Sequence, residues 1–133
     1  MPFQFSTTSL RRLEELHPQL KLLCQTALSL NLMDFSIAVG HRGQAEQDEA
    51  HAKGNSQLKW PNSLHNKFPS LAVDLLPYPT GWTKKEPFYF LAGIMLSTAS
   101  TLHIPLRWGG DWNQNGNLFD QPFYDPAHFE LQL

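Results

Sequence analysis

The spacing of leucine residues predicts two helices near the N-terminus of the chain. Leu10, Leu13 and Leu16 recur at three-residue steps, which places them along one face of a helix that Ser9 can cap. Pro18 interrupts this pattern, and because proline suits the first turn of a helix, a second helix is expected to begin there. The buried side of this second helix is expected to carry Leu20, Leu23, Ala27 and Leu30.

Apolar residues farther along the chain are spaced as in β-strands. Residues 34–40 alternate between large apolar and smaller or polar side chains, which is the period of a half-buried strand. Leu71–Leu76 is mostly apolar and indicates a buried strand. Two short strands are expected at Leu106–Trp108 and Phe129–Leu131, on either side of a polar loop.

Two further helices are expected between these strands. Gln44–Lys53 is rich in Ala, Glu and Gln and precedes Gly54, a residue that readily adopts the left-handed conformation at helix ends. Pro87 opens the other helix, whose apolar residues follow the helical period: Phe88, Leu91, Met95, Ala99 and Leu102. Residues 54–70 lack sustained periodicity and are expected to form a surface loop. The pattern therefore predicts an α+β fold with a small, mainly antiparallel sheet and flanking helices.

Composition adds the expectation of a single globular domain at residues 1–133. This length suits one hydrophobic core and is too short for two ordinary domains. A hydrophobic content of 41% and a net charge of -2 argue against disorder and against a strongly basic nucleic-acid-binding protein. The single cysteine, Cys24, lies in an apolar stretch and is expected to be a buried thiol. Because no signal segment and no apolar run of roughly 20 residues is present, the chain is expected to be made in a cytoplasm and to be soluble there. It is also expected to be a monomer.

Three short segments contain residue types that bind metal ions: Ser63-Leu64-His65, Ala72-Val73-Asp74 and Asp125-Pro126-Ala127-His128. A catalytic zinc ion usually has three protein ligands and a fourth position for water, and two imidazoles with one carboxylate satisfy this requirement. His65, Asp74 and His128 are therefore candidate zinc ligands. Asp125 precedes His128 by three residues and is a candidate general base for the attacking water.

Arg42 and Glu130 are candidates for supporting roles, each with a plainer alternative. Arg42 follows a predicted strand end, where its guanidinium could stabilise an oxyanion or bind a substrate carboxylate. The alternative for Arg42 is an ion pair on the surface. Glu130 shares a side of its strand with His128 and would orient that ligand, unless it is an ordinary exposed carboxylate.

The polar loop that follows residue 110 opens like a calcium-binding loop. Asp111, Asn113 and Asn115 supply oxygen atoms at alternate positions, and a glycine then allows the sharp turn. The twelfth position is Pro122, so the usual bidentate glutamate is missing and Asp120 is the available substitute. Any calcium site would be weak, and a turn rich in Asp and Asn side chains is an equal alternative.

Taken together, these motifs resemble a known family of zinc peptidases. The resemblance is carried by Ser63-x-His65, Ala72-x-Asp74, Asp125-x-x-His128-x-Glu130 and Arg107-Trp108-Gly109-Gly110-Asp111-Trp112. The family includes zinc D-alanyl-D-alanine carboxypeptidases, dipeptidases and phage L-alanyl-D-glutamate endopeptidases, and it shares a fold with lysostaphin-type enzymes and Hedgehog. The last motif looks like the phage endolysin branch. The resemblance extends over nearly the whole chain.

The resemblance implies a role for each candidate residue. It implies zinc bound by His65, Asp74 and His128. Asp125 would act as acid and base, and Arg42 would help to stabilise the tetrahedral intermediate.

Two substrate contacts and one departure from the family complete this interpretation. Ser63 would lie beside the substrate or support a ligand. Trp108 and Trp112 would form an aromatic wall for a peptide stem, although core packing explains them nearly as well. Eight residues separate His65 from Asp74, where the family usually has about six, and the extra segment Phe68-Pro69-Ser70 is expected to bulge out of the loop.

The function implied by the resemblance is hydrolysis of the L-alanyl-D-glutamate bond in peptidoglycan stems, causing lysis of a bacterial host. The chain would be made in the host cytoplasm and act on the cell wall after release. The alternatives are a D-alanyl-D-alanine carboxypeptidase or dipeptidase, and a metal-stabilised wall-binding module without turnover. Neither nucleic acid nor membrane insertion is expected to be involved.

Overall fold

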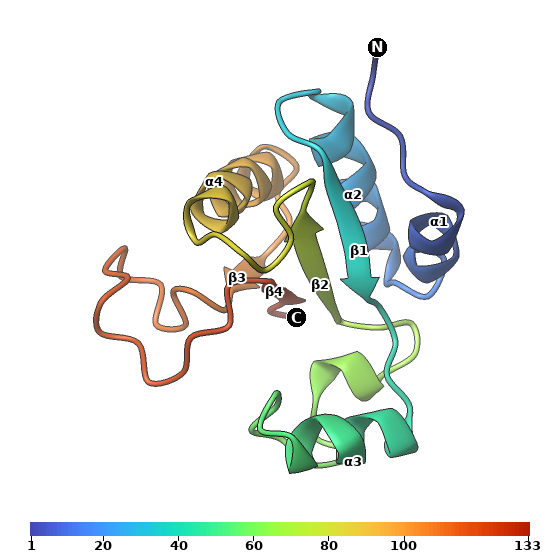
Figure 1. Ribbon diagram of the computed structural model, residues 1–133, viewed down its shortest axis with the longest axis vertical. Coiled ribbons are helices and arrows are strands. Elements are labelled where there is room, and N and C mark those ends of the chain that lie inside the picture. Colours follow the sequence, from blue (N-terminus) through green and yellow to red (C-terminus); the bar gives the residue numbers. More distant parts are fainter.

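A four-stranded antiparallel sheet lies at the centre of the protein, whose residues 1–133 are all described by a computed structural model (Figure 1). The strands follow the spatial order β1 (Phe35–Val39), β2 (Ala72–Pro77), β4 (His128–Leu131) and β3 (Leu106–Trp108). Each neighbouring pair is antiparallel. The predicted α+β class and small antiparallel sheet are confirmed, and every strand agrees with its predicted bounds to within one residue.

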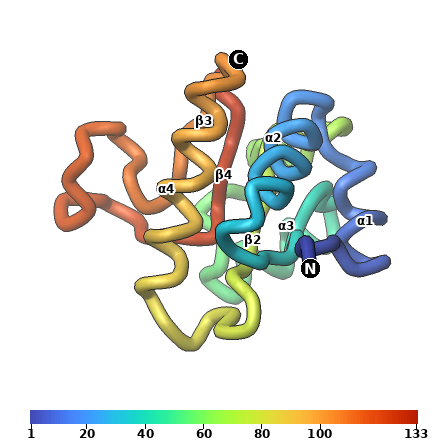
Figure 2. Tube along the Cα trace, turned by 90° about the horizontal axis from the view of Figure 1, so that it is seen from above, coloured from blue at the N-terminus to red at the C-terminus, as the bar shows by residue number.

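Four helices and one short 3-10 helix surround the sheet. α2 (Pro18–Ser29) packs against α4 (Glu86–Thr101), and α1 (Thr7–Leu13) packs beside β1. α3 (Gln44–Ala52) and the 3-10 helix η1 (Leu64–Asn66) lie beyond one end of the sheet (Figure 1). The loop between β3 and β4 extends outward on the side opposite α1, as Figure 2 shows from above. The sheet is therefore bordered by α3 and by this loop where the helices α2 and α4 do not cover it.

The first two helices begin with different kinds of cap. Ser6, rather than the predicted Ser9, caps α1, because Ser6 Oγ accepts a hydrogen bond of 3.1 Å from the Ser9 amide. Ser9 is buried inside the helix, and its hydroxyl accepts a hydrogen bond from the Ile37 amide of β1. Pro18 opens α2 as predicted, and the preceding His17 caps it through Nδ1. The prediction that Ser9 caps the helix was wrong because its hydroxyl forms a hydrogen bond with a distant strand instead.

Two of the leucines predicted to be buried are exposed. Leu10 is 50% exposed and Leu30 is 48% exposed, whereas the other five positions predicted for the first two helices are buried. α1 is only two turns long and packs along β1, which leaves Leu10 on its outer side. Leu30 lies just after the last residue of α2, so the helical period no longer directs its side chain towards the core.

The hydrophobic core fills the space between one face of the sheet and the helices. Strand residues such as Ile37, Leu75 and Phe129 pack there with leucines of α2 and α4. Cys24 is fully buried among them, as predicted, and burial raises the pKa of its thiol to about 12. None of the helices combines the length and the apolar character that crossing a bilayer requires.

Residues 54–70 are more deeply embedded than a surface loop. Gly54 ends the α3 region with a φ of 77°, as predicted, but Ser63, His65 and Ser70 farther along are buried. The expected bulge is present at Phe68, which is 71% exposed. Ser70 instead turns inward, and its hydroxyl donates a hydrogen bond of 2.6 Å to the Ala72 carbonyl. The segment therefore folds back against β2, because its buried backbone and polar side chains find hydrogen-bond partners there.

Candidate metal centre and active-site cleft

The face of the sheet opposite the core carries a row of charged side chains. Successive residues of a strand point to opposite faces, so Asp74 points away from the core that its neighbours Val73 and Leu75 join. Asp74 pairs with His128 across β2 and β4, and Arg107 pairs with Glu130 across β4 and β3. These pairings line up charged groups from three strands on one surface.

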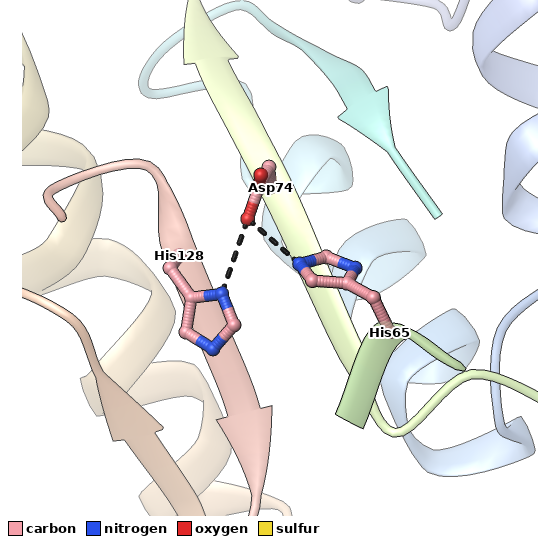
Figure 3. A group of neighbouring side chains, drawn as sticks. All are labelled: His65, Asp74 and His128. Atoms are coloured by element: carbon pink, nitrogen blue, oxygen red, sulfur yellow. Dashed lines mark hydrogen bonds and ion pairs between the residues drawn. The ribbon is translucent and has the colours of Figure 1, made fainter. Parts of the chain in front are cut away.

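His65, Asp74 and His128 converge at the start of this row (Figure 3). His65 comes from η1, Asp74 from β2 and His128 from the first position of β4. Asp74 Oδ1 lies 3.1 Å from His65 Nε2 and 3.2 Å from His128 Nδ1. The three potential ligand atoms all lie within 4.8 Å of one another. The structure thus brings together the three residues predicted as metal ligands.

The second nitrogen of each imidazole is held by an acceptor. His65 Nδ1 lies 2.8 Å from the Gly40 carbonyl oxygen, and His128 Nε2 lies 2.8 Å from Glu130 Oε1. A carbonyl and a carboxylate only accept hydrogen bonds, so these ring nitrogens carry the protons. The nitrogens that face Asp74 donate to its carboxylate when they are protonated, and on loss of that proton they offer lone pairs to a cation, which is the usual arrangement for histidine ligands.

Position 40 is too crowded for any residue other than glycine. A Cβ atom at this position would lie 2.8 Å from Glu15 Oε1 and 2.9 Å from the Arg12 carbonyl oxygen. Close packing of β1 against the end of α1 thereby places the Gly40 carbonyl on His65. The glycine of the Gly40-His41-Arg42 sequence thus allows the close packing through which the Gly40 carbonyl orients the candidate ligand His65.

The electrostatics of the cluster favour a charged Asp74. Burial alone raises the pKa of this carboxyl group, but the charges and hydrogen bonds of the two histidines hold it far below its usual range. Burial lowers the pKa of His128, yet hydrogen bonds with Asp74 and Glu130 outweigh this effect and raise it to about 9. The carboxylates therefore attract positive charge to this point, whether a proton or a metal ion.

Asp125 lies beside the three converging residues without joining them. Its Oδ2 is 3.9 Å from His128 Nδ1. Burial, followed by the negative charge of Asp74, raises the pKa of Asp125 to about 6. A Cβ atom on Gly109 would collide with the Asp125 carbonyl, and the amide of Asp125 donates to the Gly109 carbonyl. The glycine therefore permits the close backbone contact that positions Asp125.

Arg42 belongs to a buried polar network, which contradicts the alternative of a surface ion pair. Its Nη1 donates a hydrogen bond of 3.0 Å to Gln47 Oε1, and its Nη2 lies 3.7 Å from Asp74 Oδ2. The Arg42 side chain is only 12% exposed. Gln47 is fully buried and also donates to Ser56 and to the Leu58 carbonyl. Gln47 thus connects Arg42 to the residues that border the cleft, a role that the helical sequence around it did not indicate.

Ser63 and Glu130 support the histidines. Ser63 Oγ accepts a hydrogen bond of 3.2 Å from the His65 amide and caps η1. Glu130 is 7% exposed and contacts His128 and Arg107, so it is not an ordinary exposed carboxylate. Hydrogen bonds and charges from these two partners lower the pKa of Glu130 despite its burial, which alone would raise it.

The two tryptophans of the Trp-Gly-Gly-Asp-Trp run occupy different environments. Trp108 is 4% exposed, belongs to the core and donates from Nε1 to the Pro126 carbonyl, so the prediction that it contacts a substrate is corrected. A Cβ atom at Gly110 would collide with the Trp108 ring, which explains how this ring folds inward. Trp112 instead lines the cleft, and its ring lies 5.4 Å from that of His128.

Three of the four residues of the predicted calcium loop come together around an amide group. Gln121 Nε2 lies within 3.3 Å of oxygen atoms from Asp111, Asn113 and Asp120. Asn115 does not contact this amide; it donates to the Asp120 carboxylate through its side-chain amide and to the Asp111 carboxylate through its backbone amide. The Gln121 amide thus takes the position among the oxygens that the prediction assigned to a cation.

A cleft of about 1020 Å³ contains these groups. Residues 54–65 form one border and residues 122–126 the other, with the charged sheet face as the floor. Trp82, which is 64% exposed and carried no signal in the sequence, also lines the cleft. The cleft combines aromatic side chains with charged groups of both signs, so it is suited to an elongated polar ligand.

Comparison with known proteins gives a consistent result. The sequence model of the family described as phage L-alanyl-D-glutamate peptidase matches residues 1–132. The L-alanyl-D-glutamate peptidase of Escherichia phage T5 is 34% identical over 137 residues, which cover 98% of this chain and 99% of the relative. The crystal structure of the Serratia marcescens L-Ala D-Glu endopeptidase ChiX matches with a TM-score of 0.77 and 28% identity, over 98% of this chain and 91% of that chain.

Proposed function

The chain belongs to the phage L-alanyl-D-glutamate peptidase family, and from this premise we propose that it is a zinc-dependent enzyme. Family membership and the structural match give it the activity of an endopeptidase that hydrolyses the L-alanyl-D-glutamate bond of peptidoglycan. The proposal adds the identity of the metal and the task of each residue in the cleft.

The convergence of His65, Asp74 and His128 carries the proposal. Ligands roughly 2.0–2.2 Å from a tetrahedral zinc ion lie about 3.4 Å apart. Asp74 Oδ1 is 3.1 and 3.2 Å from the two histidine nitrogens, close to this spacing, and all three ligand atoms lie within 4.8 Å of one another. Magnesium and calcium favour oxygen ligands, whereas two imidazoles with one carboxylate suit zinc. When bound, zinc would lower the pKa of a water molecule towards neutrality and polarise the scissile carbonyl.

Asp125 is proposed as the general base. Its carboxylate faces the cleft beside His128 without belonging to the ligand group. From there Asp125 takes a proton from the attacking water and later delivers it to the amine of the leaving D-glutamate. The hydrogen bond from its own amide to Gly109 keeps the backbone of Asp125 in place during both transfers.

Arg42 is proposed to stabilise the negative charge that develops on the carbonyl oxygen. Its guanidinium is held by Gln47 and lies next to Asp74, so the positive charge is positioned before the substrate arrives. Ser63 is proposed to border the substrate while it holds η1, and therefore His65, in position. In this arrangement residues 1–133 act as one catalytic domain.

The proposed partner is the peptide stem of peptidoglycan, reached from the host cytoplasm when the wall becomes accessible at lysis.

We also propose that the loop at Asp111 binds calcium. Calcium would have to displace the Gln121 amide from the surrounding oxygens. Titration of calcium into the zinc-loaded protein tests this part, because an unchanged melting temperature and unchanged activity would remove it.

Digestion of purified peptidoglycan tests the proposed function. The zinc-loaded protein and a chelated control are incubated with the same material, and the fragments are analysed by mass spectrometry. Chelator-sensitive release of stems that begin at D-glutamate is expected, with recovery of activity when zinc is restored.

Two other outcomes have distinct signatures. Release of D-alanine or its dipeptide alone would indicate a carboxypeptidase or dipeptidase that uses the same residues. No cleavage by a protein that demonstrably contains zinc would indicate a wall-binding module.

A further inference from the structure

The cleft contains a second arginine, Arg107, for which the proposed hydrolysis provides no task. Arg107 is the central residue of β3, and it faces the cleft while its neighbours Leu106 and Trp108 face the core. It pairs with Glu130 on β4, so its side chain lies on the same surface as the candidate metal ligands. The side chain is 34% exposed, compared with 12% for Arg42.

The Arg107 guanidinium is held in one orientation. Its Nη2 donates a hydrogen bond of 2.6 Å to Glu130 Oε2. The guanidinium carbon lies 5.3 Å from the centre of the Trp112 ring, within the range of a cation–π contact. Trp112 and Glu130 both contact His128, so this cation is one side chain away from the candidate metal centre.

Most of the hydrogen-bonding capacity of Arg107 is unused. A guanidinium has five N–H groups, and only Nη2 has a partner within the protein. Nε is buried and forms no hydrogen bond. The N–H groups of Nη1 and the second N–H of Nη2 remain for a ligand, and paired N–H groups of a planar guanidinium match the geometry of a carboxylate.

Arg42 is less available for such a ligand. Both of its terminal nitrogens already face oxygen atoms of the protein, one on Gln47 and one on Asp74. Arg42 therefore suits the carbonyl oxygen next to the metal ligands, while Arg107 suits a second anionic group a short distance away.

The substrate of the proposed reaction has such a group. D-glutamate has two carboxyl groups, and whichever of them continues the peptide stem, the other remains free. That free carboxylate is only a few bonds from the scissile amide nitrogen. We propose that Arg107 binds the free carboxylate of the D-glutamate residue and makes the enzyme prefer a carboxylate over an amide at this position. This inference rests on the proposed function.

Two matched synthetic stem peptides test the inference. One has the free D-glutamate carboxylate and the other has the same group converted to an amide, and kcat/KM is measured for both. The wild-type enzyme is expected to prefer the carboxylate by about tenfold to a hundredfold, the usual range for one hydrogen-bonded charge. Arg107→Met is expected to lower this ratio to near one, and Arg107→Lys to keep part of the preference.

Arg42→Met is the matched control. It removes a cation from the same cleft, but it should slow both peptides by a similar factor because both present the same scissile carbonyl. If Arg107→Met also slows both peptides equally, Arg107 acts only by holding Glu130, and the inference is wrong. Equal hydrolysis of the two peptides by the wild-type enzyme would overturn it as well.

A binding measurement separates this inference from the proposed function. If the wild-type enzyme hydrolyses neither peptide, the proposed function fails. Calorimetry with the D-glutamyl product peptide and its amidated form then still tests Arg107. Tighter binding of the carboxylate form by the wild-type protein, with the difference lost in Arg107→Met, would support the inference, and equal binding would refute it.

Discussion

The two faces of the central sheet are built from the same strands and differ in almost every physical property. On β2, Val73 and Leu75 are fully buried in the core, whereas Asp74 between them faces the cleft. On β4, Phe129 packs in the core, whereas His128 and Glu130 point to the other side. Neighbours in sequence therefore belong to different environments because side chains alternate along a strand.

The difference shows how a small protein combines stability with chemistry. The core face is stabilised by burial of apolar surface, and this hydrophobic interaction does not require a particular orientation of the side chains. The cleft face consists of charged groups whose burial is unfavourable unless they are paired, and Asp74, His128 and Glu130 each pair with a residue of another element. Changes on the core face should thus affect the free energy of unfolding, and changes on the cleft face should affect turnover.

Replacement of Asp125 is expected to have the largest effect. Asp125→Asn keeps the shape of the side chain but removes the proposed base, so kcat should fall by about 100-fold to 10,000-fold. The zinc content, measured by atomic absorption, and the melting temperature should stay close to those of the wild type. Unchanged turnover in this variant would overturn the proposed role of Asp125.

Replacement of Leu75 tests the opposite face at the next position after Asp74 in β2. Leu75→Ala leaves a cavity in the core and should lower the free energy of unfolding by about 2–5 kcal/mol. Urea unfolding measures this loss, while kcat per folded molecule should change by less than about threefold. A large loss of kcat with little loss of stability would show that the two faces are not separate in function.

Replacement of Gly109 is expected to have a smaller effect on kcat. It tests whether a backbone contact at the end of β3 positions a residue of the cleft face. Gly109→Ala introduces a Cβ atom that collides with the Asp125 carbonyl, so Asp125 must shift. A shift of about 1 Å at a catalytic group lowers kcat by roughly tenfold to a hundredfold. Gly93→Ala is a suitable control because a Cβ atom there meets no neighbour. Equal kcat in the two variants would contradict the positioning role of Gly109.

Sequence patterns predicted the elements well and the individual contacts less well. The strands and the proline-opened helices were predicted because local periodicity and proline geometry act over a few residues. The roles of Ser9 and Trp108 were wrong because both depend on distant partners, Ile37 in one case and Pro126 in the other. The role of Gln47 was not predicted because nothing near it in the sequence shows that it is fully buried and bonded to Arg42.

The candidate site shows the same division. Motif spacing singled out His65, Asp74, His128 and Asp125, and the structure brings all four to one cleft. The sequence also contained Arg107 and Trp112 in one motif, but it could not show that they contact each other and face the cleft. The loop at Asp111 is a similar case, since its oxygens surround an amide that lies ten residues away.

By itself, the sequence determined most of the secondary structure, the α+β class and the residue types available for metal binding, because these follow from short-range periodicity and side-chain chemistry. Only the tertiary structure decided which nitrogen of each histidine faces Asp74, which arginine remains free to bind a ligand, and which tryptophan lines the cleft. These properties depend on strand register and on contacts between residues far apart in the chain. Such contacts form only when the whole core packs together.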